Sequence, residues 1–305
     1  MRCLMVKSRA KIDRYDQERI LIPLKDGSGD TISAALSRPR GETTRPLIVL
    51  IHGLTGLENS FYMRQSAGHF LALGYPVLRL NLRGVGRSRP LCATQYHAGS
   101  SGDLAKIFSG LPEELTKRGL AAVGYSLGGN LLLKYLGESG GKTPLLAAAT
   151  VSAPLDLAVS ARRLNHWRNT LYQRYLLFYM KTEAVAPEAK LTAAERKTVL
   201  RTRSVWQFDN DYSAKRAGLN DAAEYYARFS SGRFLAGITA PVLLLHARDD
   251  PWIPASSYDA IDWSRYPNLR PVLTARGGHI GFHGRDRTAW HDLAIARFFA
   301  GFRPA

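Results

Sequence analysis

The chain has 305 residues, of which 45% are hydrophobic and 22% charged, a composition typical of a soluble globular protein with a full core. No apolar run approaches the roughly 18 residues that a membrane-spanning helix needs. The formal net charge of +17 comes from basic residues spread along the whole chain, without an RNA-binding aromatic signature or a basic helix. We therefore expect no nucleic-acid partner.

The amino-terminal residues, M-R-C-L-M-V-K-S-R, have too short an apolar stretch for the core of a signal peptide. We therefore expect a cytoplasmic protein. The two cysteines, Cys3 and Cys92, stand alone without metal-ligand spacing, which favours reduced thiols.

The first elements predict the edge and the centre of a sheet. Residues 20–24 and 31–36 flank the turn D-G-S-G-D and indicate an antiparallel hairpin. The run L-I-V-L-I at residues 47–51 is continuously apolar, as in a strand buried on both faces of a parallel sheet. It ends in H-G-L-T-G. In enzymes whose nucleophile lies on a strand-to-helix turn, the loop here supplies an oxyanion donor, which we assign to the backbone N–H of Leu54. His52 is better explained as a structural residue than as an acid or base.

The next segments continue the alternation of helices and strands. We expect a helix at residues 60–73, a strand at residues 76–80 and a helix at residues 101–116 with an interruption near residues 110–112. Between them, the loop N-L-R-G-V-G-R-S at residues 81–88 contains neither G-x-G-x-x-G nor G-K-[ST]. It therefore predicts a structural turn rather than a phosphate-binding loop.

Residues 124–129, G-Y-S-L-G-G, stand between a strand-like and a helix-like segment. They match the nucleophile elbow G-x-S-x-G, with Ser126 at the apex of a sharp turn. Gly124 and Gly128 allow strand and helix to approach while the serine takes a strained conformation. The N–H of Leu127, at the start of the helix, then points to where an oxyanion would form. The alternative interpretation is an ordinary turn serine.

After a strand at residues 146–152 the pattern changes to helical spacing, with many arginine and aromatic residues. We expect a helical cap at residues 155–235, inserted between core parts at residues 1–154 and 236–305. Its apolar stripe consists of Leu164, Trp167, Leu171, Tyr175 and Phe178. We expect this stripe to pack over the catalytic cleft. Peripheral contact with a membrane surface is the alternative, because the polar face carries Arg162, Arg163, Arg168 and Arg174.

The acid and the base are expected after the last two strands, at residues 241–246 and 269–274. Asp250 is preferred as the acid because D-P-W-I-P fits a D-x-x-x-P run, with Asp249 as the near alternative and Asp156 as the distant one. The loop A-R-G-G-H-I-G-F-H-G supplies the base. His279, flanked by glycines, is preferred there to His283. A closing amphipathic helix is expected at residues 288–302, with its apolar positions at Trp290, Leu293, Ala294, Phe298 and Phe302.

Several motifs taken together closely resemble the YheT-like branch of the α/β-hydrolases, from about residue 20 to the carboxyl terminus. They are H-G-L-T-G, Y-H-A-G, G-Y-S-L-G-G-N, F-D-N-D-Y, E-Y-Y, A-R-D-D-P and G-G-H-I-G-F. The order Ser126, Asp250, His279 is also the α/β-hydrolase order of nucleophile, acid and base. The resemblance implies an α/β-hydrolase fold, in which helices flank a mostly parallel sheet, and a serine esterase or lipase-like enzyme of lipid metabolism.

The expected reaction is hydrolysis of carboxylic esters of short- to medium-chain acids, with a small-molecule acyl ester as partner and no metal or organic cofactor. His279 takes the proton of Ser126, and Asp250 orients the imidazolium. The N–H groups of Leu54 and Leu127 bind the oxyanion. Acyl transfer to an alcohol and phospholipase cleavage by the same three residues are the alternatives. A non-catalytic binding protein is less favoured, because no member of the triad is missing. The oligomeric state is left open.

Overall fold

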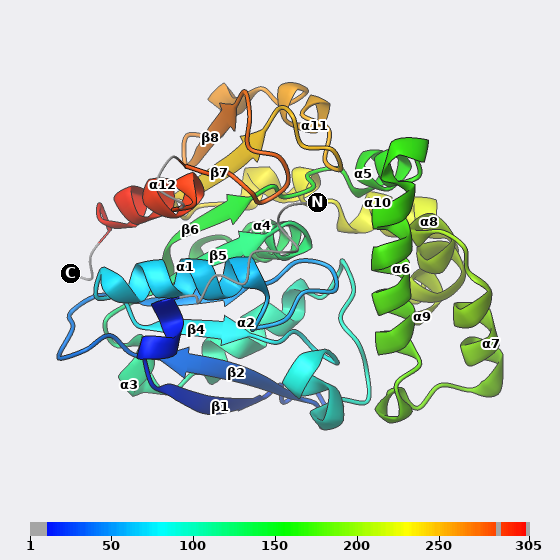
Figure 1. The fold of residues 1–305 in the computed structure, drawn as a ribbon, viewed down its shortest axis with the longest axis horizontal. Coiled ribbons are helices and arrows are strands. Elements are labelled where there is room, and N and C mark those ends of the chain that lie inside the picture. Colours follow the sequence, from blue (N-terminus) through cyan, green and yellow to red (C-terminus); the bar gives the residue numbers. More distant parts are fainter. Residues whose placement is uncertain (1–10, 285–287, 303–305) are drawn as a thin grey trace.

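The computed structural model describes residues 11–284 and 288–302, and its centre is an eight-stranded sheet (Figure 1). The strands are β1 (Gln17–Pro23), β2 (Thr31–Ser37), β3 (Leu47–Ile51), β4 (Val77–Leu80), β5 (Leu120–Tyr125), β6 (Leu145–Val151), β7 (Val242–Ala247) and β8 (Leu269–Thr274). They lie in the order β1-β2-β4-β3-β5-β6-β7-β8. The pairs β1–β2 and β2–β4 are antiparallel and all the others are parallel. The predicted antiparallel edge and parallel centre are both present.

The central strands are buried on both faces because their side chains alternate between two apolar clusters. On β3, Leu47, Val49 and Ile51 pack into one cluster, whereas Ile48 and Leu50 pack into the other. This is the consequence of a two-residue side-chain period in a strand whose every residue is apolar. The sheet therefore needs a layer of helices on each side.

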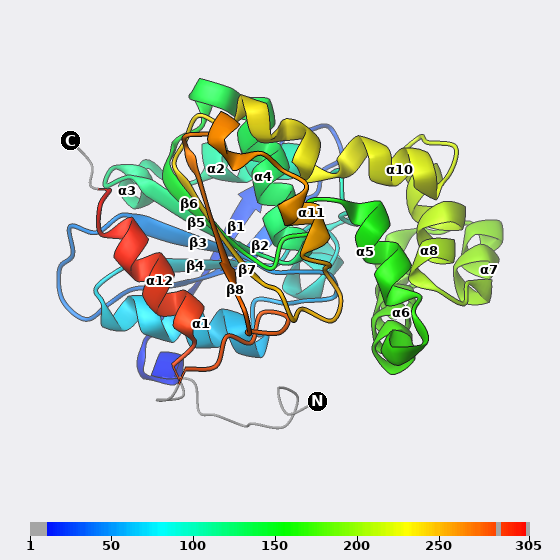
Figure 2. The same ribbon diagram turned by 90° about the horizontal axis from the view of Figure 1, so that it is seen from above.

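Two layers of helices cover the sheet. The helices of the core are α1 (Phe61–Ala72), α2 (Ser101–Gly110), α3 (Glu113–Thr116), α4 (Leu127–Ser139), α11 (Ser256–Asp259) and α12 (Trp290–Phe299). Figure 2 shows α1 and α12 on one face and α2 and α4 on the other. The predicted apolar face of α12 is partly wrong, because Trp290 and Leu293 are exposed, whereas the helix buries His291, Asp292, Ile295 and Phe299.

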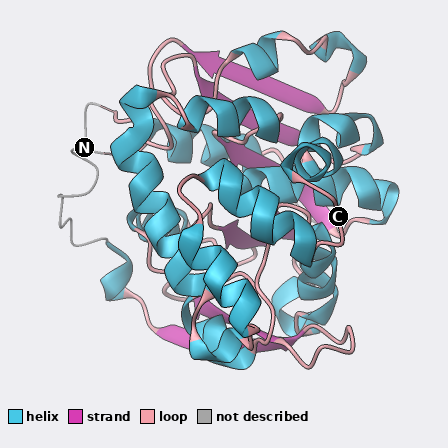
Figure 3. Cartoon of the chain, turned by 90° about the vertical axis from the view of Figure 1, so that its right-hand side faces the viewer, coloured by secondary structure: helices cyan, strands magenta, loops and turns pink. Residues whose placement is uncertain are grey.

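Between β6 and β7 the chain leaves the sheet and forms helices only. These are α5 (Leu157–Leu164), η5 (Trp167–Asn169), α6 (Thr170–Ala184), η6 (Pro187–Ala189), α7 (Ala193–Arg201), α8 (Val205–Phe208), η7 (Asp209–Ser213), α9 (Ala214–Arg216), α10 (Ala222–Phe229) and η8 (Ser231–Gly237). Helices α6 to α9 group at one end of the sheet (Figure 1), and in Figure 3, which views the molecule from that end, helices lie in front of the strands. The last of these elements, η8, packs closely on α4: a Cβ added at Gly237 would lie 2.2 Å from the carbonyl oxygen of Gly137.

The predicted packing of the apolar stripe over the cleft is confirmed for part of the stripe: Leu164, Leu171 and Tyr175 line the cavity described below, whereas Trp167 and Phe178 do not. The helical path is interrupted at η5, between α5 and α6. There the side-chain amide of Asn169 donates hydrogen bonds to the carbonyl oxygens of Arg163 and Pro251. Trp167, Leu171 and Phe178 are 72%, 75% and 63% exposed. Helix α6 buries a different face, made of Leu176, Leu177, Met180 and Ala184, against Val199, Val205, Phe208 and Tyr212. The helix has two apolar faces, and spacing alone did not identify the one that packs.

Two further sequence predictions concern the ends of the chain and its cysteines. Cys92 is a buried free thiol, whereas Cys3 and the other residues before residue 11 lie outside the described residues. Within residues 11–284 and 288–302, no helix combines the length and the apolar character required to cross a bilayer.

Candidate active site

Ser126 lies at the turn between β5 and α4, in a backbone conformation that L-residues rarely adopt, with φ 50° and ψ −121°. Such a conformation costs roughly 1–3 kcal/mol and persists only where the surroundings enforce it. The neighbouring glycines leave no room for a side chain. A Cβ at Gly128 would lie 2.4 Å from the carbonyl oxygen of His52, and one at Gly124 would lie 2.5 Å from that of Gly128. The turn therefore holds the serine hydroxyl at the edge of the sheet, as the elbow motif predicts.

The loop after β3 lies directly beside this turn. A Cβ at Gly53 would stand 3.0 Å from Cβ of Ser126. Within the described residues, the N–H groups of Leu54 and Leu127 have no hydrogen-bond acceptor, although those on either side of Leu54 do. Two N–H groups near one serine hydroxyl are thus left available for an oxygen atom that the protein does not supply.

Two tyrosines that sequence reasoning missed hold this loop. The hydroxyl of Tyr62 accepts the N–H of Gly53 at 3.0 Å, and that of Tyr96 accepts the N–H of Thr55 at 3.0 Å. Tyr96 belongs to the Y-H-A-G motif, to which the sequence analysis gave no role beyond the family resemblance. Tyr62 lies on α1 and has no local signature in the sequence.

His279 and Asp250 come together from the loops after β8 and β7. Nδ1 of His279 lies 2.9 Å from Oδ2 of Asp250, while Oδ1 accepts the N–H groups of Trp252 and Ile253 at 2.9 and 3.0 Å. Burial by itself would raise the pKa of Asp250, but the charge of His279 and these hydrogen bonds outweigh it and lower the pKa below its ordinary value. The carboxyl group therefore stays ionised beside the imidazole.

The alternative acids and base occupy other positions. Asp249 accepts the N–H groups of Gly277 and Gly278, both at 2.8 Å, and so ties down the loop that carries His279. Asp156 caps α5 through the N–H of Val159. His283 is exposed at the rim of the cavity described below.

His52 is buried and makes two hydrogen bonds with the backbone. Its Nε2 accepts the N–H of Leu82 at 3.1 Å, so Nδ1 carries the hydrogen and donates to the carbonyl of Gly53 at 2.8 Å. Burial lowers the pKa of His52 to about 4. A neutral imidazole with both nitrogens engaged in the backbone is a structural element, as the sequence suggested.

Ser126 and His279 line one large cavity of about 1550 Å³ between the sheet edge and the cap. Within the described residues, no hydrogen bond joins the hydroxyl of Ser126 to the imidazole. The cap lines the cavity with apolar side chains, among them Leu164, Leu176, Met180, Val205 and Phe208. The rings of Tyr172 on α6 and Trp252 stack 3.4 Å apart, and Trp252 packs 4.5 Å from the ring of His279. An aromatic stack thus connects the cap to the histidine.

Two carboxyl groups also line the cavity, of which Glu183 is half-buried and Asp209 is buried. Burial raises the pKa of Glu183 on α6 to about 8, although Gln95 donates to it at 3.2 Å. Burial likewise raises the pKa of Asp209 to about 6, against the hydrogen bond from Tyr226 at 2.7 Å. At neutral pH Glu183 is therefore mostly uncharged, whereas Asp209 is mostly ionised.

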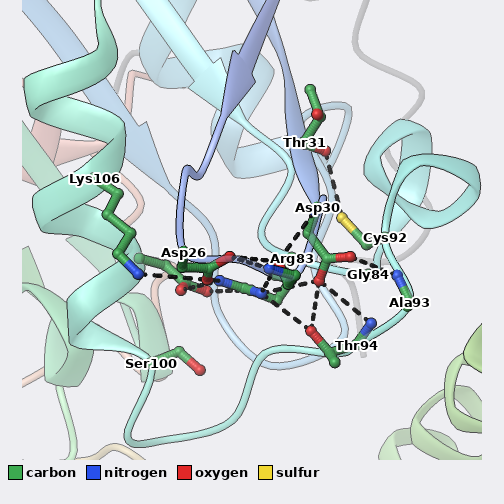
Figure 4. Close-up of polar contacts among 12 residues, drawn as sticks. Asp26, Asp30, Thr31, Arg83, Gly84, Cys92, Ala93, Thr94, Ser100 and Lys106 are labelled. Carbon is green, nitrogen blue, oxygen red and sulfur yellow. Dashed lines mark hydrogen bonds and ion pairs between the residues drawn. The ribbon is translucent and has the colours of Figure 1, made fainter.

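A cluster of charged side chains surrounds Arg83, in the loop after β4 (Figure 4). It stabilises one wall of the cavity, to whose lining Arg83 and Asp103 belong. Arg83 donates to Asp30 in the β1–β2 turn at 2.9 Å and to both oxygens of Asp103 on α2 at 2.9 and 2.7 Å. The hydrogen bond from Arg83 also lowers the pKa of Asp26 well below its ordinary value. The glycine-rich loop thus joins three parts of the core through this cluster. Across residues 11–284 and 288–302, no group of three or more His, Cys, Asp or Glu side chains has an arrangement that could hold a metal ion.

A family model described as alpha/beta hydrolase fold matches residues 46–286. The chain belongs to the α/β-hydrolase family. It is 33% identical to YheT of Escherichia coli over 84% of this chain and 76% of that protein. This relationship confirms the YheT-like resemblance that the motifs indicated.

Other relatives carry names that describe ester chemistry. The chain is 31% identical to medium-chain fatty acid ethyl ester synthase/esterase 2 of Saccharomyces cerevisiae, over 86% of this chain and 63% of that protein. It is 33% identical to phospholipase ABHD3 of Mus musculus, over 79% of this chain and 59% of that protein. The chain therefore spans less than two thirds of these two relatives. Among solved structures, the Pyrococcus furiosus esterase Pf2001 shares the fold, with a TM-score of 0.64 and 15% identity over 98% of this chain and 97% of that chain.

Proposed function

We propose that this α/β-hydrolase is a serine esterase that cleaves carboxylic esters of short- to medium-chain acids with Ser126, His279 and Asp250. The strained turn at Ser126 carries the proposal. It lies beside two N–H groups without an acceptor and shares its cavity with a hydrogen-bonded histidine–aspartate pair. The names of the yeast and mouse relatives agree with ester cleavage.

In the proposed reaction, Nε2 of His279 takes the hydroxyl proton of Ser126 while Oγ forms a bond to the ester carbonyl carbon. The carbonyl oxygen becomes an oxyanion and accepts the N–H groups of Leu54 and Leu127. The imidazolium then gives its proton to the departing alcohol oxygen as the ester C–O bond breaks. Water attacks the acyl-enzyme by the same steps and releases the acid. Asp250, kept ionised by its lowered pKa, stabilises the imidazolium.

The test is the replacement Ser126→Ala, with Ser109→Ala, an exposed serine of α2, as the matched control. We expect kcat/KM on p-nitrophenyl butyrate to fall by at least ~10³-fold in the first variant and to stay unchanged in the second. A fluorophosphonate should label the wild-type chain and the control but not Ser126→Ala. Full activity in a folded Ser126→Ala protein would remove the assignment. An unlabelled, inactive wild-type chain would favour the non-catalytic binding protein.

The apolar cap lining supports the acyl side of the proposal. We expect activity on p-nitrophenyl esters to peak at short to medium acyl chains. The replacement Met180→Trp, in the cavity wall, should shift that peak to shorter chains, whereas Leu200→Trp, at an exposed position of α7, should not. An unchanged profile in a folded Met180→Trp protein would argue against the acyl chain lying there.

Acyl transfer is the second candidate, favoured by the name of the yeast relative, ester synthase/esterase. The same acyl-enzyme would pass its acyl group to an alcohol instead of water. Adding ethanol to the hydrolysis assay and measuring the ethyl ester separates the two outcomes, and phospholipid in place of a simple ester tests phospholipase activity.

A further inference from the structure

The outward face of α6, together with Trp167 of the preceding η5, forms an exposed apolar surface, here named the cap patch. It consists of Trp167, Leu171, Tyr175, Phe178 and Tyr179. Leu171, Tyr175 and Phe178 follow one another at the spacing of a single helix face. Leaving this many large apolar side chains in water on one helix is unfavourable unless something covers them.

The cap patch borders the opening of the cavity. Leu171 and Tyr175 belong both to the patch and to the cavity lining, and the neighbouring Arg168 also lines the cavity. On its other side, α6 packs into the cap core, so the helix is held in place by buried contacts while this face stays uncovered. A molecule lying on the patch would therefore also face the opening.

The charges around the cap patch are mostly positive. Residues 157–184 include one acidic residue, Glu183, and five basic ones, Arg162, Arg163, Arg168, Arg174 and Lys181. The four arginines are exposed, and within the described residues none of them forms an ion pair. Arg168 stacks over the ring of Trp167, 5.2 Å from its centroid. Because the pKa of the half-buried Glu183 is raised to about 8, this carboxyl offsets little of the positive charge at neutral pH.

An anionic lipid surface fits both properties of this face. Tryptophan and tyrosine side chains favour the boundary between lipid and water, and exposed arginines are attracted to anionic headgroups. A second copy of the chain fits poorly, because each copy carries a net charge of +17 and the same ring of arginines would face itself. We propose that the cap patch docks on an anionic lipid surface, with the opening of the cavity towards the lipid.

The experiment is co-sedimentation of the full chain with vesicles of phosphatidylcholine mixed with phosphatidylglycerol, compared with phosphatidylcholine alone. All proteins carry Ser126→Ala, so that lipid hydrolysis does not alter the vesicles and the result does not depend on the proposed esterase activity. The test variant is Trp167→Gln with Phe178→Gln, two patch residues outside the cavity lining. The matched control is Leu21→Gln with Leu293→Gln, two exposed apolar side chains on β1 and α12.

We expect binding to the mixed vesicles that weakens in high salt, and a loss of at least ~10-fold in affinity in the test variant but not in the control. Arg168→Gln with Arg174→Gln should weaken binding to the mixed vesicles by about tenfold and leave binding to phosphatidylcholine alone unchanged. Absence of wild-type binding, or equal binding by the folded test variant, overturns the proposal. A dimer in sedimentation velocity that the test variant loses, without vesicle binding, would instead assign the patch to a second copy. Hydrolysis of p-nitrophenyl butyrate, measured with Ser126 restored, should be the same in the test variant and the wild type.

Discussion

The sheet core and the cap bury their apolar residues under different constraints. A central strand such as β3 is covered on both faces, so every apolar residue in it is used and only one arrangement satisfies the pattern. Helix α6 is covered on one face, yet carries apolar residues on two. The pattern of the core therefore predicts its packing, whereas the pattern of the cap leaves a choice.

The two regions also use their polar groups differently. The core neutralises its buried charges within the chain, as Arg83 does with Asp26, Asp30 and Asp103. The cap pairs Arg216 with Glu195 but leaves Arg162, Arg163, Arg168 and Arg174 exposed, and it holds the pKa of the half-buried Glu183 at about 8.

The largest effect should come from the core at its tightest contact, where Gly128→Ala forces a Cβ to within 2.4 Å of backbone at His52. We expect the free energy of unfolding to fall by about 3 kcal/mol and esterase activity to disappear, because neither backbone segment can yield easily. Gly141→Ala, where a Cβ meets open space, should leave both unchanged. Thermal unfolding measures the stability of both variants, and a p-nitrophenyl ester assay measures their activity. A stable, active Gly128→Ala protein would contradict the close packing of the elbow.

The core charge cluster gives the next largest effect and a dependence on pH. Asp30→Asn removes the charged partner of Arg83, Thr94 and the N–H of Ala93, and should cost about 2–3 kcal/mol at pH 7. The hydrogen bonds to Asp30 outweigh its burial and hold the pKa below the ordinary 3.8, so its contribution is present above that value and is lost as the pH falls through the lower, folded-state pKa. Denaturant unfolding at pH 7 and pH 3 should show a narrowing difference between variant and wild type. Asp259→Asn, in the exposed pair with Arg248, should cost less than ~1 kcal/mol at both pH values.

The cap should show the opposite dependence on pH through Glu183. Because its folded-state pKa is raised from 4.5 to about 8, its contribution to stability is present below pH 4.5 and is lost as the pH rises through 8. Glu183→Gln should therefore gain about 2 kcal/mol relative to wild type between pH 5 and pH 9. Glu188→Gln, an exposed cap residue, should show no such trend. Parallel unfolding curves of Glu183→Gln and wild type at both pH values would mean that the carboxyl is not buried.

The smallest effect should come from Tyr96, between the core and the cap. Its replacement tests whether this tyrosine positions the oxyanion loop or takes part in substrate binding. Tyr96→Phe leaves the N–H of Thr55 without its acceptor and loosens the loop that carries the N–H of Leu54. We expect kcat to fall roughly tenfold while KM changes little, because the loop contributes mainly to the transition state. Tyr266→Phe, at a half-buried position in the connection between β7 and β8 that does not line the cavity, serves as the control. A rise in KM with unchanged kcat would indicate that Tyr96 shapes the substrate pocket instead.

Much of the core and of the candidate site could be predicted because local chemistry constrains them. The elbow glycines around Ser126 have no tolerated alternative, since a Cβ would meet backbone on the other segment. Asp250 and His279 could be chosen as acid and base because each lies among proline or glycine residues directly after an apolar strand. The carboxyl ends of parallel strands meet at one edge of the sheet, so the two loops are expected to lie close together. Tyr62 was missed because its hydroxyl, on α1, accepts the N–H of Gly53 nine residues earlier in a loop, and such a contact leaves no local sequence pattern.

The sequence by itself determined which candidate catalytic residues stand at the ends of which strands. It could do so because the burial of a strand and the formation of a tight turn depend on residues that are neighbours in the chain. Only the tertiary structure decided which face of α6 packs, that Asp249 binds Gly277 and Gly278 rather than the histidine, and that the pKa of the half-buried Glu183 is raised. These outcomes depend on contacts between distant segments, whose energies outweigh local preference once the cap lies on the core. The same contacts leave Trp167, Leu171 and Phe178 facing outwards, beside the opening to Ser126.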